Sequence, residues 1–289
     1  SNWIIYICPH SVLELSGVMM FDATEFLIIG QSLSVLTYIF GVLVYALPLP
    51  MIGLKKWAPR LVSDGIYALI LVTAYNIIVT TANQLQIQLT GSWPSYLEWI
   101  DNNIATLTAI YQYVLFFVGV LSVIPYVGSV TQALFPTWTV TTILSGALSF
   151  LSTLELISLL IYNDFTVLVA MGIMLFALPF RLGRAIGASL LASSIIFYIG
   201  LPYMPTFLIN IGLSPLSPNE IYLPLNQHVT NTTIVNTFQL VYQYIVPSVL
   251  GYLVFGPMIY LGILSGLSIG LANTIAGYGG RLPFPLDVI

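Results

Sequence analysis

Residues 24–50 read TEFLIIGQSLSVLTYIFGVLVYALPLP, an apolar run that is uncharged after Glu25 and ends at Pro48 and Pro50. Roughly 20 such residues in a helix are enough to cross the hydrocarbon core of a bilayer. The basic stretch LKKWAPR follows at 54–60. An apolar helix that ends in a short basic loop is typical of a membrane span, so the stretch predicts an integral membrane protein with a first span at 24–49.

The composition of the whole chain agrees with a membrane protein. Of its 289 residues, 58% are hydrophobic and only 6% are charged, whereas soluble domains carry about 25% charged residues. The single cysteine, Cys8, excludes an internal disulfide framework and a cysteine-based metal cluster. We therefore expect an all-α fold, a polytopic transmembrane helix bundle of about seven spans.

The other spans are predicted from further apolar segments separated by polar, proline-rich or glycine-rich stretches. After the first span they are expected at 64–84, 104–124, 138–161, 165–180, 185–202 and within 234–276. A tight turn at 162–164 would join the fourth span to the fifth. This organisation divides the chain into an outer interfacial or re-entrant segment at 1–23, a six-span bundle at 24–210, an outer polar loop at 211–233, and a long kinked final span with a cytoplasmic tail at 234–289.

The last apolar block, 234–276, is longer than one span requires. Pro257 removes a helical hydrogen-bond donor and clashes with the preceding turn, so we expect a kink at Gly256-Pro257. One long, bent span is favoured because no polar turn interrupts the block. A hairpin that crosses twice stays open.

The basic residues predict the orientation. All six fall in three short clusters, and short loops rich in Lys and Arg stay on the cytoplasmic side. With seven spans, this rule places the N-terminus outside and the C-terminus inside, whereas the hairpin would place Arg281 outside. The same cations are candidate contacts to a cytoplasmic partner, lipid headgroups or DNA phosphates, although their effect on topology accounts for them without such contacts. These candidates are Lys55, Lys56, Arg60, Arg181 and Arg184.

Glu155 lies within the predicted fourth span. A carboxylate inside a membrane is costly, so it is a candidate pathway or proton-coupled residue by default. The alternative is a structural role, in which Ser152, Thr153 or Ser158 hydrogen-bonds to it, or interfacial water reaches it. Replacement by Gln with retained transport would remove the functional interpretation.

Glycines repeat every four residues in two places, at Gly183 and Gly187 and at Gly262, Gly266 and Gly270. Residues four apart share a helix face, and small residues there allow another helix to approach closely. These faces are predicted to pack either within the chain or against another subunit. Asn231 begins an Asn-Thr-Thr sequon and is a candidate glycosylation site. No motif for catalysis, a cofactor or a metal is found, so we do not expect an enzyme.

One segment resembles a known family. Residues 171–202, MGIMLFALPFRLGRAIGASLLASSIIFYIGLP, are similar to the central segment of the TrbL/VirB-type polytopic inner-membrane subunits of type IV secretion systems. In those subunits a span ends in a proline–arginine turn and the next opens with small residues. The matching positions are Gly172, Phe176, Pro179, Arg181 and Gly187. The predicted topology also resembles that of the CedA family, the archaeal counterpart in crenarchaeal DNA import.

The resemblance implies a membrane-embedded channel or platform subunit of a DNA import or conjugation-like machine in the cell membrane. Its implied partners are other membrane subunits, small pilus-like proteins, a VirB4/HerA-like ATPase, DNA and the lipid bilayer. The chain has a smaller outer domain than many bacterial members. Two alternatives stay open: a structural or assembly subunit of another membrane complex, respiratory or pilus, and a small-solute transporter.

Overall fold

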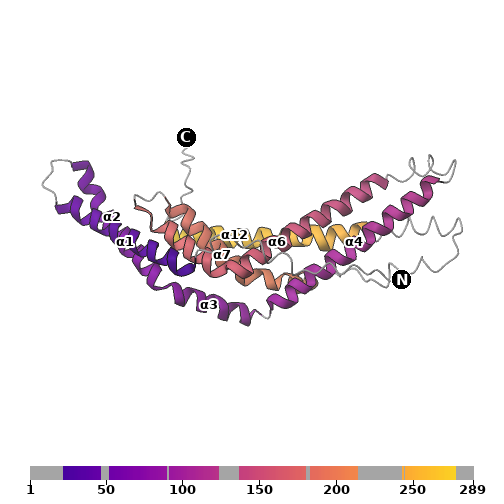
Figure 1. Cartoon of the computed structure of the whole chain (residues 1–289), viewed down its shortest axis with the longest axis horizontal. Helices are drawn as coiled ribbons and strands as arrows, with labels where there is room; N and C mark the ends of the chain where they lie inside the picture. The colour runs from indigo at the N-terminus through magenta and orange to yellow at the C-terminus, as the bar shows by residue number, and fades with distance from the viewer. Residues whose placement is uncertain are drawn as a thin grey trace. The chain divides into compact units, whose positions relative to one another are not determined.

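The structure is a computed structural model that describes residues 22–46, 52–89, 91–123, 137–179, 183–213, 243 and 245–277. Within these ranges the protein is helical and has no strand (Figure 1). In chain order the elements are α1 (Ala23–Ala46), α2 (Ile52–Thr73), α3 (Tyr75–Gln88), α4 (Trp93–Val123), α6 (Thr137–Phe176), α7 (Arg184–Gly200), η3 (Leu201–Tyr203), α8 (Met204–Asn210), α11 (Val246–Ser248), η6 (Val249–Phe255) and α12 (Gly256–Ala276).

Several of these helices are long and apolar enough to cross a membrane, which confirms the predicted helical membrane character. The described part holds four such segments: Ala23–Ala46, Trp138–Phe176, Arg184–Asn210 and Val246–Ala276. The broken pair Ala58–Thr73 and Tyr75–Gln88 makes a fifth if it crosses as one span.

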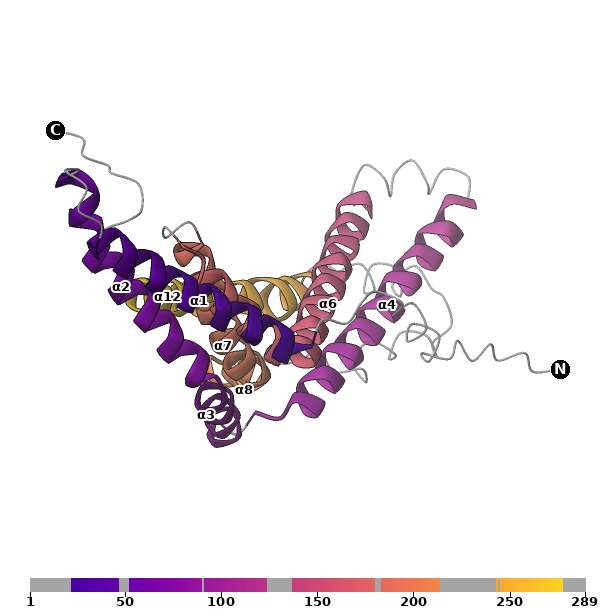
Figure 2. The ribbon, with the colours of Figure 1, turned by 60° about the vertical axis from the view of Figure 1, so that its left-hand side comes forward.

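The described residues fall into two compact units. The first takes its residues from Ser1–Tyr75 and Thr166–Leu191, and in it α1 lies beside α2 (Figures 1 and 2). Small residues form the contact surfaces. A Cβ added to Gly41 would meet Val62, and one added to Gly65 would meet the backbone of Tyr38, each at 2.8 Å. This close approach of backbones is how helices pack in a bilayer, where hydrophobic burial between them contributes little.

The second unit takes its residues from Asn76–Phe165 and Ala192–Ile289, and here large side chains fill the core. On α6 the buried positions follow a seven-residue repeat, alternating steps of four and three: Val140, Leu144, Ala147, Leu151, Leu154, Ser158, Ile161 and Phe165. On α4 they follow nearly the same spacing: Trp93, Tyr96, Ile100, Leu107, Ile110 and Val114. Such a repeat keeps one seam of each helix facing its partner, as in a coiled coil.

Two predicted connections have different outcomes. The stretch LKKWAPR, expected as a loop, lies in the first turns of α2, and Pro59 is inside that helix. A single proline removes one backbone hydrogen bond, which the packing of α2 on α1 offsets. The break expected at 162–164 is present as a kink: Asp164 (φ −108°, ψ 17°) is non-helical, and two helices meet there within α6.

The final apolar block is helical throughout its described part, 245–276. A π-helical segment, η6, changes to the α-helical geometry of α12 at Gly256, directly before Pro257. The wider π-helical turn accommodates the ring of Pro257, which would collide with the carbonyl one turn earlier in a regular α-helix. The change of geometry falls at the Gly256-Pro257 pair, where a kink was expected. Residues 278–289, including Arg281, lie outside the described part.

Candidate functional site

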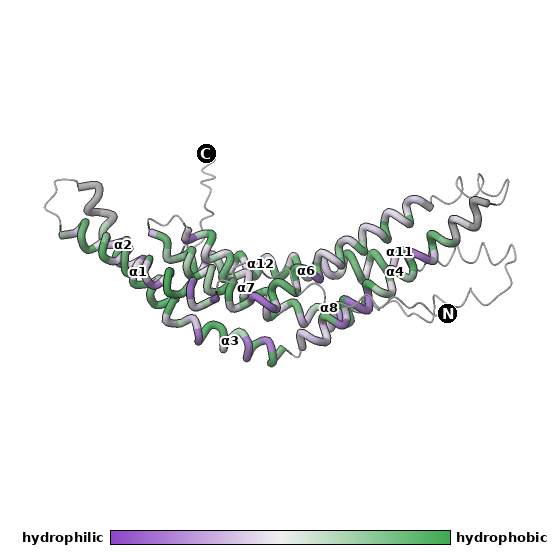
Figure 3. The backbone as a smooth tube through the Cα atoms, in the orientation of Figure 1, coloured by the Kyte–Doolittle hydropathy of each residue, from purple (hydrophilic) through white to green (hydrophobic). Residues whose placement is uncertain are grey.

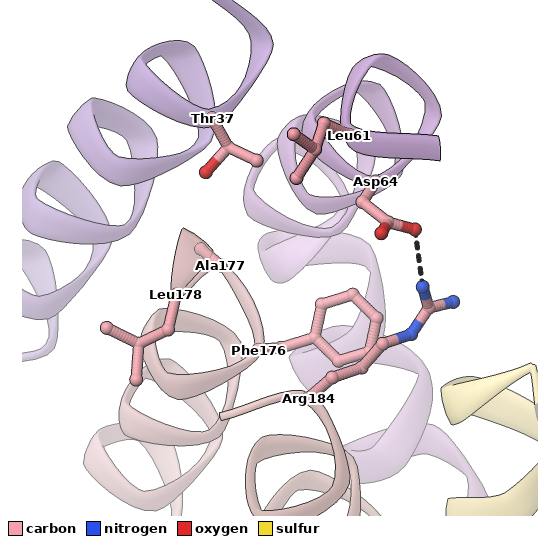
Figure 4. Close-up of a pocket in the computed structure, with 7 residues that line it drawn as sticks. All are labelled: Thr37, Leu61, Asp64, Phe176, Ala177, Leu178 and Arg184. Carbon is pink, nitrogen blue, oxygen red and sulfur yellow. Dashed lines mark hydrogen bonds and ion pairs between the residues drawn. The ribbon is translucent and has the colours of Figure 1, made fainter. Parts of the chain in front are cut away.

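The best-defined polar site of the first unit surrounds Arg184, at the start of α7 (Figure 4). Its guanidinium Nη1 donates to Oδ1 of Asp64 on α2 at 2.5 Å. The guanidinium also lies over two aromatic rings, 5.1 Å from the centre of Phe176 and 5.8 Å from that of Tyr67. Thr37, Leu61, Ala177 and Leu178 complete the lining of the small cavity around the pair.

Burial makes this ion pair a structural element. The side chains of Arg184 and Asp64 are only 13% and 15% exposed, and a charge with so little water around it needs its partner. Nε of Arg184 has no hydrogen-bond partner among the described residues. The pair holds α2 to the start of α7, so the charge of Arg184 is already balanced within the chain.

The other predicted basic contacts do not assemble into a described site. Arg60 is exposed on α2, with its carbonyl accepting a hydrogen bond from Ser63. Lys55 and Lys56 are on the first turns of α2, but their side chains lie outside the described part. Arg181 is outside it entirely. Arg60 is thus the one predicted basic contact that the described part shows exposed to solvent.

Glu155 is half-buried on α6, and its carboxyl group interacts electrostatically with that of Asp101 on α4. Like charges that interact in this way repel each other. Of the local partners expected for Glu155, Thr153 donates to the carbonyl of Ser149 and Ser158 to that of Leu154. The neighbour of Glu155 is therefore an acidic residue from another helix.

An aromatic cluster joins α4 to its neighbours in the second unit. The ring of Trp93 lies 5.7 Å from Tyr96, 5.2 Å from Tyr162 and 5.6 Å from Tyr198. Trp93 and Tyr96 are only 3% and 1% exposed. They belong to the core because they begin the repeating seam of α4.

Most polar groups of this cluster are paired. The hydroxyls of Tyr96 and Ser158 are 3.0 Å apart, and Trp99 Nε1 donates to the Tyr252 hydroxyl at 2.8 Å. Tyr198 donates to Asn83 Oδ1 at 2.8 Å. Nε1 of Trp93 is the exception, with no partner among the described residues. Buried hydrogen bonds of this kind fix one arrangement of the packed rings.

The two glycine repeats differ in the space around them. A Cβ on Gly183 would collide with the carbonyl of Leu175, and one on Gly187 with the backbone of Phe176 and Gly172. These glycines allow the connection from α6 into α7 to pack within the first unit. A Cβ on Gly262, Gly266 or Gly270 would meet no described atom within 4 Å. The α12 repeat is therefore not a packing face within the described part of this chain. Asn231 lies outside the described residues.

Comparison with known proteins gives the family. A family profile described as "DNA import protein CedA1" matches residues 14–88, which include α1, α2 and α3. A curated relative, DNA import protein CedA of Sulfolobus acidocaldarius, is 35% identical over 269 residues, which are 93% of this chain and all of that protein. No solved structure matches significantly. Because the similarity covers the whole relative and nearly all of this chain, the chain belongs to the CedA family of DNA import proteins.

Proposed function

We propose that the chain is a membrane-embedded channel or platform subunit through which DNA is imported. The observation that carries this proposal is the similarity to DNA import protein CedA over 93% of the chain. The apolar helices support a place in the cell membrane, crossed several times, because up to five described segments are long enough to span it. The resemblance of 171–202 to TrbL/VirB-type subunits supports a mechanism related to type IV secretion and conjugation.

The proposal includes an orientation. The N-terminus is outside and the C-terminus inside, as the distribution of basic residues predicts. The number of crossings depends on α6. If its two parts, before and after Asp164, cross separately, the chain has seven spans; if α6 crosses once, it has six and its two ends lie on the same side.

The proposed partners follow from the same resemblance. Other membrane subunits and small pilus-like proteins would surround the chain in the bilayer, and a VirB4/HerA-like ATPase would work from the cytoplasm. Arg60 is a candidate for that contact because it is exposed. The chain itself supplies no catalysis in this scheme.

The direct test is deletion of the gene in its own host, followed by measurement of chromosomal marker transfer. We expect import of DNA to be lost, export from the same cells to be unchanged, and a plasmid copy to restore import. Normal import in the deletion strain would overturn the proposal. Co-purification in mild detergent with mass spectrometry would test for an ATPase and further membrane subunits.

A second candidate function, a non-transporting assembly subunit, is favoured by the open glycine face of α12. Small residues at Gly262, Gly266 and Gly270 suit close contact with another helix, and no described atom of this chain occupies that face. Cross-linking from this face to another subunit, with no effect of channel-blocking thiol reagents on DNA uptake, would favour assembly over conduction.

A further inference from the structure

The helix α3 turns an uncharged polar face outward. Four residues at intervals of four, Asn76, Thr80, Gln84 and Gln88, are exposed. Thr81 is exposed beside them, as are the apolar side chains of Ile77, Leu85 and Ile87. Figure 3 shows the resulting alternation of hydrophilic and hydrophobic residues along α3.

The polar side chains on the opposite side of α3 are hydrogen-bonded within the chain. Ala82 is buried, Asn83 accepts a hydrogen bond from Tyr198 at 2.8 Å, and Gln86 donates to the carbonyl of Gly91 at 2.5 Å. The exposed amides of Asn76, Gln84 and Gln88 form no hydrogen bond with another described residue. Their partners must come from outside the described part of the chain.

A comparison with α12 shows that this is not a normal lipid-facing surface. Over 258–270, the exposed large side chains of α12 are all apolar: Met258, Ile259, Ile263, Leu267 and Ile269. Its one exposed polar side chain there, Ser265, donates to the carbonyl of Leu261 in the same helix. Over 258–270 the surface of α12 therefore suits lipid without leaving a polar side chain unpaired, and the exposed amide of this helix, Asn273, lies in its last turn.

The exposed amides of α3 are not satisfied in this way, because no described carbonyl accepts from Asn76, Gln84 or Gln88. Moving an unpaired amide from water into a hydrocarbon costs roughly 4–8 kcal/mol. Asn76 and Thr80 lie inside the predicted span 64–84, where lipid would be their neighbour. Polar residues at such positions face a protein interior or a water-filled cavity.

We propose that the exposed face of α3, at Asn76, Thr80 and Gln84, borders a water-filled cavity within the membrane. Water fits this face better than a bound anion, because α3 carries no charged residue, and a weakly polar wall would let a charged chain slide past without holding it. The inference rests on the proposed channel role, and it names residues that would face water in that channel.

Cysteine accessibility tests the proposal in membranes of the native host. Because Cys8 is the only cysteine, Cys8→Ser gives a background without thiols, into which Asn76→Cys, Thr80→Cys and Gln84→Cys are placed one at a time. The matched control is Ile259→Cys, whose wild-type side chain is 59% exposed on the apolar face of α12. Each variant is exposed to a small cationic methanethiosulfonate and, separately, to a maleimide on a large polyethylene glycol.

We expect the α3 cysteines to react with the small reagent at least about tenfold faster than the control, because apolar surroundings raise a thiol's pKa and each unit lowers the reactive thiolate about tenfold. The large reagent should label them only after denaturation. Rates equal to that of Ile259→Cys would overturn the proposal. Labelling of all three by the large reagent in intact membranes would also overturn it, because α3 would then lie on the membrane surface.

The same variants separate this inference from the proposed function. Treatment of Asn76→Cys cells with the small reagent should reduce DNA uptake, while treatment of Ile259→Cys cells should not. If gene deletion leaves uptake unchanged but Asn76→Cys still reacts quickly, DNA import is wrong and the water-facing surface stands. If deletion abolishes uptake but the α3 cysteines react no faster than the control, DNA import stands and this inference fails.

Discussion

The guanidinium of Arg184 and the carboxylate of Asp64 are 2.5 Å apart and more than four-fifths buried. Replacing Arg184 by Met would leave the Asp64 carboxylate without this guanidinium, and breaking a buried pair in this way costs about 3–5 kcal/mol. We expect a correspondingly lower midpoint of thermal unfolding in detergent. Arg60→Gln, which changes an exposed cation on α2, is the matched control and should unfold within about 0.5 kcal/mol of wild type.

The double variant Asp64→Leu with Arg184→Met separates a charge effect from a loss of packing. With both charges removed, no ion is left buried, so the double variant should be more stable than Arg184→Met alone. A double variant that is less stable than either single variant would show that the pair does not interact as described.

Gly187 and Gly266 make a second matched comparison. Ala at position 187 would place its Cβ against the backbone of Phe176, and overpacking of this kind typically costs about 1–3 kcal/mol. Ala at position 266 would meet no described atom within 4 Å and should leave the unfolding of the isolated protein unchanged. If Gly266→Ala nevertheless removes partner subunits from purified complexes, the α12 face is an intersubunit contact. Equal destabilisation by both substitutions would contradict this account of the two glycines.

The contact between Glu155 and Asp101 predicts a mild outcome for Glu155→Gln. A Gln amide carries no charge and can donate to the Asp101 carboxylate, so the stability of the protein should not fall and DNA uptake should continue. Glu155→Leu offers no hydrogen-bond donor to Asp101 and should be less stable than Glu155→Gln. Loss of uptake in Glu155→Gln, at wild-type protein levels, would instead assign the protonatable group a role in transport.

The orientation is tested at two positions. A tag fused after Ile289 should be accessible only from the cytoplasm, and Asn231→Gln should remove a glycan if the predicted outer loop is outside in a host that glycosylates. Together these results would support a single crossing by 234–276 and, with the N-terminus outside, an odd number of crossings in the whole chain. A C-terminal tag accessible from outside would instead favour six crossings, or the hairpin in 234–276.

Much of the helical architecture can be predicted from the sequence because hydropathy and length determine which helices enter a membrane. The connections between helices were predicted less completely. The polar triplet Tyr162-Asn163-Asp164 does mark a break, because two helices meet at a kink at Asp164, whereas the basic stretch at 54–60 is helical rather than a loop. The seven-residue spacing of Trp93, Tyr96 and Ile100 is the sequence signal for the burial of these side chains.

The contacts of the candidate sites could not be predicted in the same way. Arg184 pairs with Asp64 and Glu155 with Asp101, and in each case the partner is on a distant helix. The residues next to Arg184 or Glu155 in the sequence do not identify such a partner, because the partner is set by how the helices pack. The basic cluster at 181–184 was attributed to topology, which is sufficient to explain the charge but says nothing about a buried counter-ion.

The π-helical segment η6, Val249–Phe255, has a consequence for how the gene can vary. A π-helical turn holds about one more residue than an α-helical turn. Each residue turns less in a π-helix than in an α-helix, where it turns by about 100°. Deleting one residue from η6 would therefore let the segment relax to α-helix while α12 keeps nearly the same rotation. Tyr260, Leu264 and Ser268, now buried, would still face the core. In this segment we expect related chains to tolerate the loss of one residue.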